Sequence, residues 1–137
     1  IPTRRFIAAE KFQKYLEGDQ YQEQEWFLFN DLLIGCRKPS KKKSIVRKGN
    51  LEVKYWMPMA RVQISKIPES MPFHLHFGMK IVQEGKGNVL IFASSLPVME
   101  FWYDHISAAG DAERERSAQK RASSKRSTPK KTEDWDF

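Results

Sequence analysis

Short apolar segments alternate with turn-forming residues as far as residue 94, and this pattern predicts β-strands. Residues 25–36, EWFLFNDLLIGC, are apolar in both phases of a strand, which is typical of a sheet covered on both faces, and Asn30-Asp31 indicates a bend within it. Apolar and polar residues alternate over 51–56, as in a half-buried strand. Further strands are predicted at 60–67, 73–77, 79–83 and 88–94, with a glycine-containing hairpin at 84–88 before the last.

The segment 6–18, FIAAEKFQKYLEG, is compatible with both a helix and a strand. The helical alternative would place one set of residues on a common face: Ile7, Ala8, Lys11, Phe12, Tyr15 and Leu16. The second half of the segment also fits a strand, and we predict a strand there. The total is then about seven strands.

The period changes after Ser94-Ser95. Apolar and aromatic residues now recur at three- and four-residue spacing: Val98, Phe101, Trp102, His105 and Ile106. This predicts one amphipathic helix, capped by the serine pair, with Pro97 in its first turn and its apolar stripe facing a core. The alternating charges of 110–122 allow the helix to extend, whereas residues 123–137 lack periodicity and are predicted to be disordered.

The net charge of +7 is concentrated in one segment. Residues 37–50, RKPSKKKSIVRKGN, hold seven basic and no acidic side chains, whereas residues 1–36 hold four basic and six acidic ones. The segment 51–112 is nearly neutral, and 113–137 carries +3. A block such as 37–50 is either a solvated loop or a surface attracted to phosphates and acidic partners.

Length and composition indicate one domain with tails, and we expect a fragment of a larger soluble protein. No stretch approaches the ~18 consecutive apolar residues of a membrane span, and no signal-peptide pattern is present. Cys36 is the only cysteine, which excludes an internal disulfide and favours a reducing compartment. Its expected role is that of a small buried hydrophobe.

Four segments carry a resemblance to a known family: FLFNDLLIGCRK, YWMPMARVQI, FHLHF and VLIFASSLPVMEFW. Together they resemble the pleckstrin homology domain that follows the catalytic Dbl homology domain in Rho-type guanine nucleotide exchange factors. The resemblance covers residues 5–109. It implies a mainly β, seven-stranded bent antiparallel barrel made of two nearly orthogonal sheets and capped by one C-terminal α-helix, with Trp102 plugging one end.

The resemblance also implies positions for individual segments. Residues 25–36 would form the second strand, with Phe27, Leu28 and Phe29 as structural residues. The basic segment 37–50 would be the loop to the third strand. That loop would lie at the end of the barrel that the helix caps, away from the usual headgroup site.

Family members that bind phosphoinositide headgroups tightly use basic residues on the first two strands. Lys11 and Lys14 fit this pattern. The approach to the second strand does not, because it carries Asp19, Glu23 and Glu25 and no arginine that would bind a phosphate. We therefore predict no selective headgroup pocket, and instead weak, salt-sensitive binding of anionic phospholipids to a polybasic patch. The candidate lipid-binding or anion-binding residues are Lys11, Lys14, Arg37, Lys38, Lys41, Lys42, Lys43, Arg47 and Lys48.

Other candidate chemistry is sparse. His74 and His76 would share a face of a strand, but the third histidine lies on the helix, so a structural role is expected in place of a metal site. Trp26 and Trp56 are either core or partner-facing. No phosphate-binding glycine loop and no nucleophile with an adjacent base are recognisable, so we expect no catalytic residue, metal or cofactor.

Two functions remain open. The favoured one is a noncatalytic regulatory and targeting module of a Rho-type exchange factor, cytoplasmic and peripheral at the inner plasma membrane. Its partners would be the adjacent Dbl homology domain, a Rho-family GTPase and anionic phospholipids. The alternative is a free-standing interaction domain of the same superfold that binds a peptide or acidic protein by strand addition. Nucleic-acid binding is disfavoured, because the basic charge does not alternate with aromatics on a sheet face.

Basic pairs precede hydroxyl residues in the tail. Ser123, Ser124 and Thr128 follow or adjoin such pairs, which makes them candidate phosphorylation sites for an electrostatic membrane switch. The same pairs, at 120–121, 125–126 and 130–131, also resemble a nuclear import signal. An ordinary solvated linker is the third interpretation.

Overall fold

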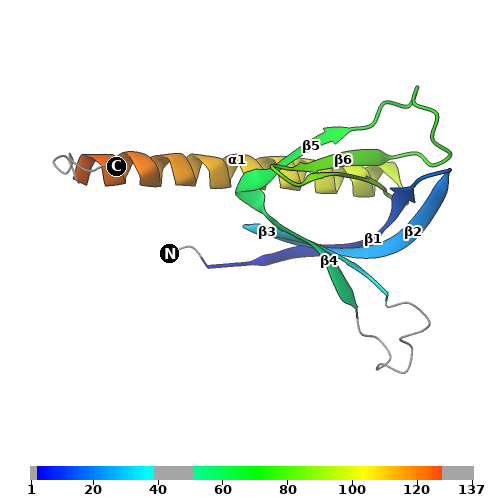
Figure 1. Cartoon of the computed structure of the whole chain (residues 1–137), viewed down its shortest axis with the longest axis horizontal. Coiled ribbons are helices and arrows are strands. Elements are labelled where there is room, and N and C mark those ends of the chain that lie inside the picture. Colours follow the sequence, from blue (N-terminus) through cyan, green and yellow to red (C-terminus); the bar gives the residue numbers. More distant parts are fainter. Residues whose placement is uncertain (1–2, 39–50, 128–137) are drawn as a thin grey trace.

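The computed structural model describes residues 3–38 and 51–127, apart from the side chains of 122–127. In these residues seven antiparallel strands form one strongly bent sheet, which a C-terminal helix follows (Figure 1). The strand order is β4-β3-β2-β1-β7-β6-β5. The elements are β1 (Phe6–Leu16), β2 (Gln20–Phe29), β3 (Leu32–Arg37), β4 (Glu52–Pro58), the 3₁₀ turn η2 (Met59–Arg61), β5 (Val62–Lys66), β6 (Gly78–Gln83), β7 (Gly87–Phe92) and α1 (Leu96–Ser127). The predicted barrel with one closing helix is confirmed.

Strand β1 joins the two halves of the bent sheet. It pairs with β2 from Phe6 to Leu16, but with β7 only where Gln13 and Lys14 lie opposite Phe92 and Ile91. On either side of this short junction, β1–β4 and β5–β7 diverge and enclose the core (Figure 1). The strand was predicted for the second half of 6–18 only. Pairing with β2 extends it over the first half as well.

The core lies between the two halves of the sheet and α1, which packs against η2, β5 and β6. Trp102 is almost fully buried and meets the ring of Phe12 edge-on, with ring centroids 5.0 Å apart. Ser95 caps the helix, because its Oγ accepts a hydrogen bond from the Val98 amide at 3.4 Å and its carbonyl oxygen accepts one from Met99 at 3.1 Å. The predicted cap and the predicted position of Trp102 are confirmed.

The buried stripe of α1 differs in part from the predicted one. Met99, Trp102 and Ile106 are buried, whereas Phe101 is 41% exposed and stacks on His105 at 4.0 Å. The helix continues through 110–122 and ends at Ser127, beyond the position where the sequence predicted disorder to begin. Ion pairs one turn apart support this extension: Arg114 with Asp111 and Arg116 with Glu113.

The predicted single strand at 25–36 is two strands, β2 and β3, joined by a tight turn at Asn30-Asp31. The turn is held by the chain before β1: the Asn30 amide donates to the Arg5 carbonyl oxygen at 3.1 Å, and Arg4 Nε lies 2.9 Å from Asp31 Oδ1. Apolar residues continue on both sides of this turn, so the sequence pattern does not mark a chain reversal.

The predicted strand at 73–77 is part of the loop between β5 and β6. Phe73 packs against the rings of Tyr15 and Phe92, at 5.0 and 5.3 Å, and Phe77 has a positive φ of 63°, which an extended strand does not allow. The apolar and polar residues of FHLHF therefore alternate because its aromatic side chains pack against the barrel, and not because the segment pairs with a strand. The predicted total of seven strands was therefore reached through two errors that cancel.

Because β2 and β3 are separate strands, the basic segment connects β3 with β4. Antiparallel pairing places its attachment points, Lys38 and Leu51, at the same end of the sheet as the β1–β2 turn. The helix-capped end is the other one, where the Met59 amide of η2 donates to the Asp31 carbonyl oxygen at 2.9 Å. The expected position of the basic loop at the helix-capped end is therefore wrong. Residues 39–50 themselves lie outside the described part of the chain.

Candidate anion-binding site

The inner face of the β1–β4 sheet changes from apolar to polar toward the end that carries the β1–β2 turn. Trp26 is buried and stacks on Tyr55, with ring centroids 5.3 Å apart. Next to it, buried Gln24 accepts a hydrogen bond from Trp26 Nε1 at 3.2 Å and donates one to Gln22 Oε1 at 3.1 Å. Side-chain amides therefore line the transition from the apolar core to the solvent-facing end of the barrel.

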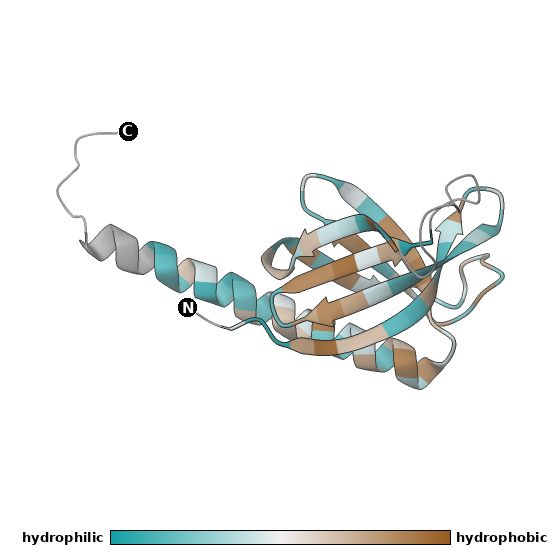
Figure 2. Cartoon of the chain, turned by 90° about the horizontal axis from the view of Figure 1, so that it is seen from below, coloured by the Kyte–Doolittle hydropathy of each residue, from teal (hydrophilic) through white to brown (hydrophobic). Residues whose placement is uncertain are grey.

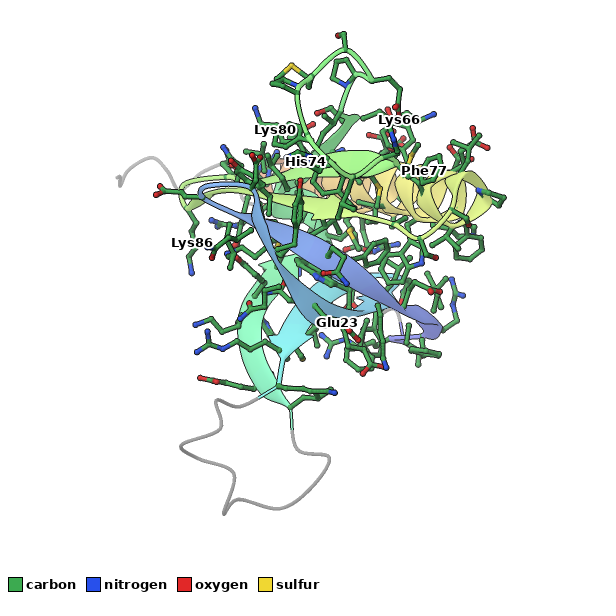
Figure 3. The ribbon with its side chains drawn as sticks, turned by 90° about the vertical axis from the view of Figure 1, so that its right-hand side faces the viewer. Glu23, Lys66, His74, Phe77, Lys80 and Lys86 are labelled. Carbon is green, nitrogen blue, oxygen red and sulfur yellow. The ribbon has the colours of Figure 1, made fainter. Side chains whose placement is uncertain are left out.

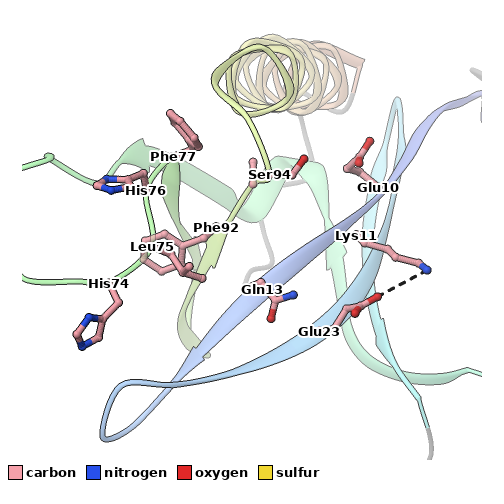
Figure 4. Close-up of a pocket in the computed structure, with 11 residues that line it drawn as sticks. Glu10, Lys11, Gln13, Glu23, His74, Leu75, His76, Phe77, Phe92 and Ser94 are labelled. Carbon is pink, nitrogen blue, oxygen red and sulfur yellow. Dashed lines mark ion pairs between the residues drawn. The ribbon is translucent and has the colours of Figure 1, made fainter.

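Lys14 is the charged group closest to this opening on β1. Its Nζ lies 5.9 Å from the centroid of the Tyr55 ring, within reach of a cation–π contact. Lys11, three residues earlier, points to the other face of the strand, where its Nζ lies 3.6 Å from Glu23 Oε2 (Figure 4). The two lysines predicted to act together therefore lie on opposite faces of the sheet.

An open groove of about 440 Å³ lies between β4 and the β6–β7 turn, and we call it the mouth groove. Among the described residues, Lys54 and Lys86 are the charged groups that line it, both are exposed, and neither forms an ion pair with another described residue. Figure 3 shows Lys86 projecting at one side of the barrel. The groove is lined by Val53, Lys54, Tyr55, Trp56, Met57, Gln83, Lys86, Gly87 and Asn88.

Gln83 fixes one wall of the mouth groove. It is 8% exposed, and its Nε2 donates a hydrogen bond to the Trp56 carbonyl oxygen at 3.4 Å, which links β6 to the edge strand β4. Tyr55 belongs to both the groove and the Lys14 contact, so Lys14, Lys54 and Lys86 lie at the same end of the barrel. Such an arrangement attracts anions, but its described residues present no arginine fork that would select a phosphate geometry.

The remaining predicted anion-binding residues divide into two groups. Arg37 is partly neutralised, because its Nε lies 3.2 Å from Glu52 Oε1, whereas Lys38 is exposed at the end of β3. The other five lie outside the described residues: Lys41, Lys42, Lys43, Arg47 and Lys48. Leu51, at the far end of the same segment, immediately precedes β4 and lies two residues before Val53, a lining residue of the mouth groove.

Lys54 and Lys86 were missed by the sequence analysis. Lys54 occupies a polar position of an alternating strand, and Lys86 lies in a hairpin, so each had a sufficient local explanation. Their proximity depends on how β4 approaches the β6–β7 turn when the barrel closes, which no local spacing reveals.

A second hollow, of about 470 Å³, lies between β1 and the β5–β6 loop (Figure 4). Most of its titratable groups have a partner: His74 Nε2 lies 3.2 Å from Asp19 Oδ2, His76 Nδ1 lies 2.8 Å from Glu69 Oε1, and Lys11 contacts Glu23, while Glu10 also lines the hollow. The two histidines therefore contact different carboxylates. Among the described residues no group of three or more potential metal ligands occurs.

Cys36, Trp26 and Trp56, whose surroundings the sequence left open, now have definite positions. Cys36 is buried; burial raises the pKa of its thiol, and the negative charge of Glu25 raises it further. Trp26 is a core residue, whereas Trp56 is 55% exposed. Leu28 is also in the core, whereas Phe27 and Phe29 are half-buried.

The candidate phosphorylation sites Ser123 and Ser124 fall within the last turns of α1, and Thr128 lies outside the described residues.

No family model and no curated protein matches this sequence. Solved structures do match. Human RhoA in complex with the DH/PH fragment of PDZRhoGEF gives a TM-score of 0.62 at 15% identity, over 80% of this chain and 29% of that one. The chain has the pleckstrin homology fold. The linker-DH/PH domains of p115-RhoGEF give a TM-score of 0.61 at 12% identity, over 82% of this chain and 30% of theirs.

An activated truncation of Vav1 gives a TM-score of 0.58 at 13% identity, over 77% of this chain and 26% of that one. The pleckstrin homology fold described here thus spans less than a third of the length of these neighbours. No described helix of the chain combines the length and the apolar content that crossing a bilayer requires.

Proposed function

We propose that the chain is a noncatalytic regulatory and targeting module of a Rho-type guanine nucleotide exchange factor. In this proposal it packs on an adjacent Dbl homology domain and acts on a Rho-family GTPase through that domain. The observation that carries the proposal is the likeness, over most of the chain, to the pleckstrin homology part of several different Rho exchange factors, one of them in complex with RhoA.

The targeting role rests on the mouth groove. Lys54 and Lys86 line it, Lys14 contacts the ring of its lining residue Tyr55, and Lys38 is the last described residue before the basic segment. The described residues at this end include no arginine fork, and the buried amides of Gln24 and Gln83 already donate within the protein, so this end should attract anionic phospholipid weakly and without preference for one headgroup isomer. The module would then be cytoplasmic and peripheral at the inner plasma membrane, with the tail as a further basic contact, a phosphorylation target or an import signal.

The alternative function, binding of an extended peptide at a sheet edge, has less support from the edges themselves. The sheet ends at β4 and β5. The Val62 carbonyl oxygen of β5 already accepts a hydrogen bond from Arg114 Nη1 at 2.8 Å, and the Trp56 carbonyl oxygen of β4 accepts one from Gln83. These bonds occupy acceptors that an added strand would need.

The regulatory role is tested by nucleotide exchange. We would measure GTPase exchange by the protein that carries both the preceding domain and this chain, and by a version that lacks residues 1–137, in solution and on anionic vesicles. We expect the shorter protein to lose more activity on vesicles than in solution, because the module concentrates the exchange domain at the membrane. Equal rates in all four conditions, or a preceding domain without exchange activity, would contradict the proposed function.

The targeting role is tested by vesicle binding. Lys54→Ala with Lys86→Ala should weaken binding by up to about 25-fold at low salt, since each lysine near an anionic surface contributes about 1 kcal/mol. Changing Lys41, Lys42 and Lys43 to Ala should have an effect at least as large. Binding by the unsubstituted chain should fall strongly between about 50 and about 300 mM salt.

The matched control removes two lysines elsewhere, with Lys66→Ala and Lys80→Ala on β5 and β6 (Figure 3). This variant has the same net charge as the mouth-groove variant, so a smaller loss would localise the membrane contact. Equal losses in the two variants would show a contact without a preferred face. Tight binding to one phosphoinositide isomer would contradict the targeting role as stated.

A further inference from the structure

The outer face of the β1–β4 sheet is apolar toward the Asn30-Asp31 turn, although no described part of the chain covers it, whereas toward the β1–β2 turn the same face carries Lys11, Glu23 and Glu25. Cross-strand pairing places Phe27 opposite Ile34, and Ile34 opposite Trp56, in one row across β2, β3 and β4. Figure 2, which views the molecule from the side of this sheet, shows hydrophobic residues along the middle of these strands. We call this surface the outer face and define it by Phe6, Phe27, Phe29, Ile34, Val53 and Trp56, of which Val53 and Trp56 also line the adjoining mouth groove.

The exposure of these residues is high for their size. Phe6 is 59% exposed, Val53 52% and Trp56 55%, and the other three are half-buried. None of the six belongs to the core cluster or packs against it, and α1 lies on η2, β5 and β6 instead. An antiparallel sheet with one solvated face normally carries polar residues there. Contiguous apolar surface of this kind marks an interaction site.

The size and charge of the outer face indicate what it binds. Neighbouring strands lie about 4.8 Å apart, so a row across four strands spans about 14 Å, the length of a helix of about three turns. At one end Glu25 lies opposite Cys36 on the same face, and it has no ion pair within the described residues, because Lys11 contacts Glu23 instead. An occupant with a basic side chain at that end would complement Glu25.

The course of the chain indicates where the occupant comes from. The segment before β1 is tied to the Asn30-Asp31 turn by Arg4 and Arg5, and Phe6 stacks on Phe29 at 5.7 Å. Any polypeptide that precedes residue 3 is therefore joined to a corner of the outer face. Covalent linkage gives such a segment a high effective concentration there.

We propose that the outer face binds an amphipathic helix of the polypeptide that precedes this chain, with the apolar stripe of the helix on Phe27, Ile34 and Trp56 and a lysine or arginine near Glu25. The inference rests on the proposed function in one respect, since it takes that polypeptide to be the adjacent Dbl homology domain. It adds which face of the module is covered and by what kind of surface.

The test measures the accessibility of the outer face directly. Val53→Cys would be introduced both into the 137-residue chain and into the protein that also carries the preceding domain, and its alkylation rate measured in each. Unsubstituted protein, with buried Cys36 alone, supplies the background. We expect labelling to be at least about tenfold slower in the longer protein, because a covered thiol cannot meet the reagent. Met71→Cys, at a 47% exposed residue of the β5–β6 loop, is the matched control and should label equally in both.

The contribution of Glu25 is tested in the longer protein. Glu25→Lys should speed the labelling of Cys at position 53 several-fold, because a basic occupant would then face a like charge. Glu84→Lys, with the same change of charge at the exposed β6–β7 turn, should not. Hydrogen exchange of β3 and β4 in the unsubstituted proteins provides a readout that needs no variant, and these strands should exchange more slowly in the longer protein.

Several outcomes would overturn the inference. Equal labelling at position 53 in the two proteins would show an open face. Slow labelling in the isolated chain that accelerates on dilution would identify a second copy of the chain as the occupant. Protection of position 53 together with a preceding domain that lacks exchange activity would keep the helix-binding face and reject the proposed function, so the two failures are distinguishable.

Discussion

Replacing Trp102 by alanine is expected to lower the free energy of unfolding by about 3 to 5 kcal/mol, which is a large part of the stability of a domain of this size. Trp102 is 2% exposed and fills the space between α1 and the barrel, where it meets Phe12 edge-on at 5.0 Å. The surrounding strands are fixed by pairing, so the cavity cannot close. Urea unfolding followed by circular dichroism measures the effect.

Phe101→Ala is the matched control on the same helix. Phe101 is an aromatic residue one position away, but it is 41% exposed and contacts only the ring of His105 among aromatic groups described. Its removal should cost less than about 1 kcal/mol. A loss of stability of similar size in the two variants would contradict the orientation of α1 on the barrel.

The helix was predictable because its signals are local. The Ser94-Ser95 cap, Pro97 and the spacing of Trp102 and Ile106 all lie within a few turns of one another, and helical periodicity is read from neighbouring residues. Phe101 was wrongly assigned to the buried stripe of the helix. Residues at three- and four-residue spacing cover a broad face, and only the packing shows which residues at its edges are buried. The helix continues past Gly110 with the ion pairs Arg114–Asp111 and Arg116–Glu113, whose formation the sequence alone does not show.

The strand boundaries were harder, because an apolar strand next to a tight turn looks the same as a longer strand. Asn30-Asp31 reverses the chain, held by Arg4 and Arg5, which lie far away in sequence. The alternation of FHLHF is produced by Phe73, which anchors a loop against β1 and β7. Both errors come from tertiary contacts that override a local period.

The candidate site was only partly predictable for a related reason. Once β1 is a strand, its period of two places Lys11 and Lys14 on opposite faces, and this separation could have been read from the sequence. The approach of Lys54 to Lys86 could not, because it depends on barrel closure. The apolar residues in both phases of 25–36 did predict a sheet covered on two faces, and the outer face shows which side still lacks a cover in the described chain.

Replacing Gly35 by alanine is expected to destabilise the domain by about 1 to 3 kcal/mol, as overpacking of a core does. A Cβ at this position would lie 2.7 Å from a ring carbon of Trp26. That ring cannot move aside, because it stacks on Tyr55 at 5.3 Å and donates a hydrogen bond to Gln24 at 3.2 Å. The sign is informative, since alanine is otherwise favoured over glycine within a strand by about 0.5 to 1 kcal/mol.

Two comparisons isolate the ring contact as the cause. Gly110→Ala is the matched control at another buried glycine, where the added Cβ would meet the guanidinium of Arg114 at 3.1 Å; shifting that group strains its bonds to Val62 and Asp111, but alanine is favoured over glycine in a helix, so the net change should be much smaller than at Gly35. In a Trp26→Leu background, Gly35→Ala should cost much less than in the unsubstituted chain, because contacting residues couple in a double-mutant cycle. If Gly35→Ala cost the same in both backgrounds, the close approach of Trp26 to the β3 backbone would not be what requires glycine there.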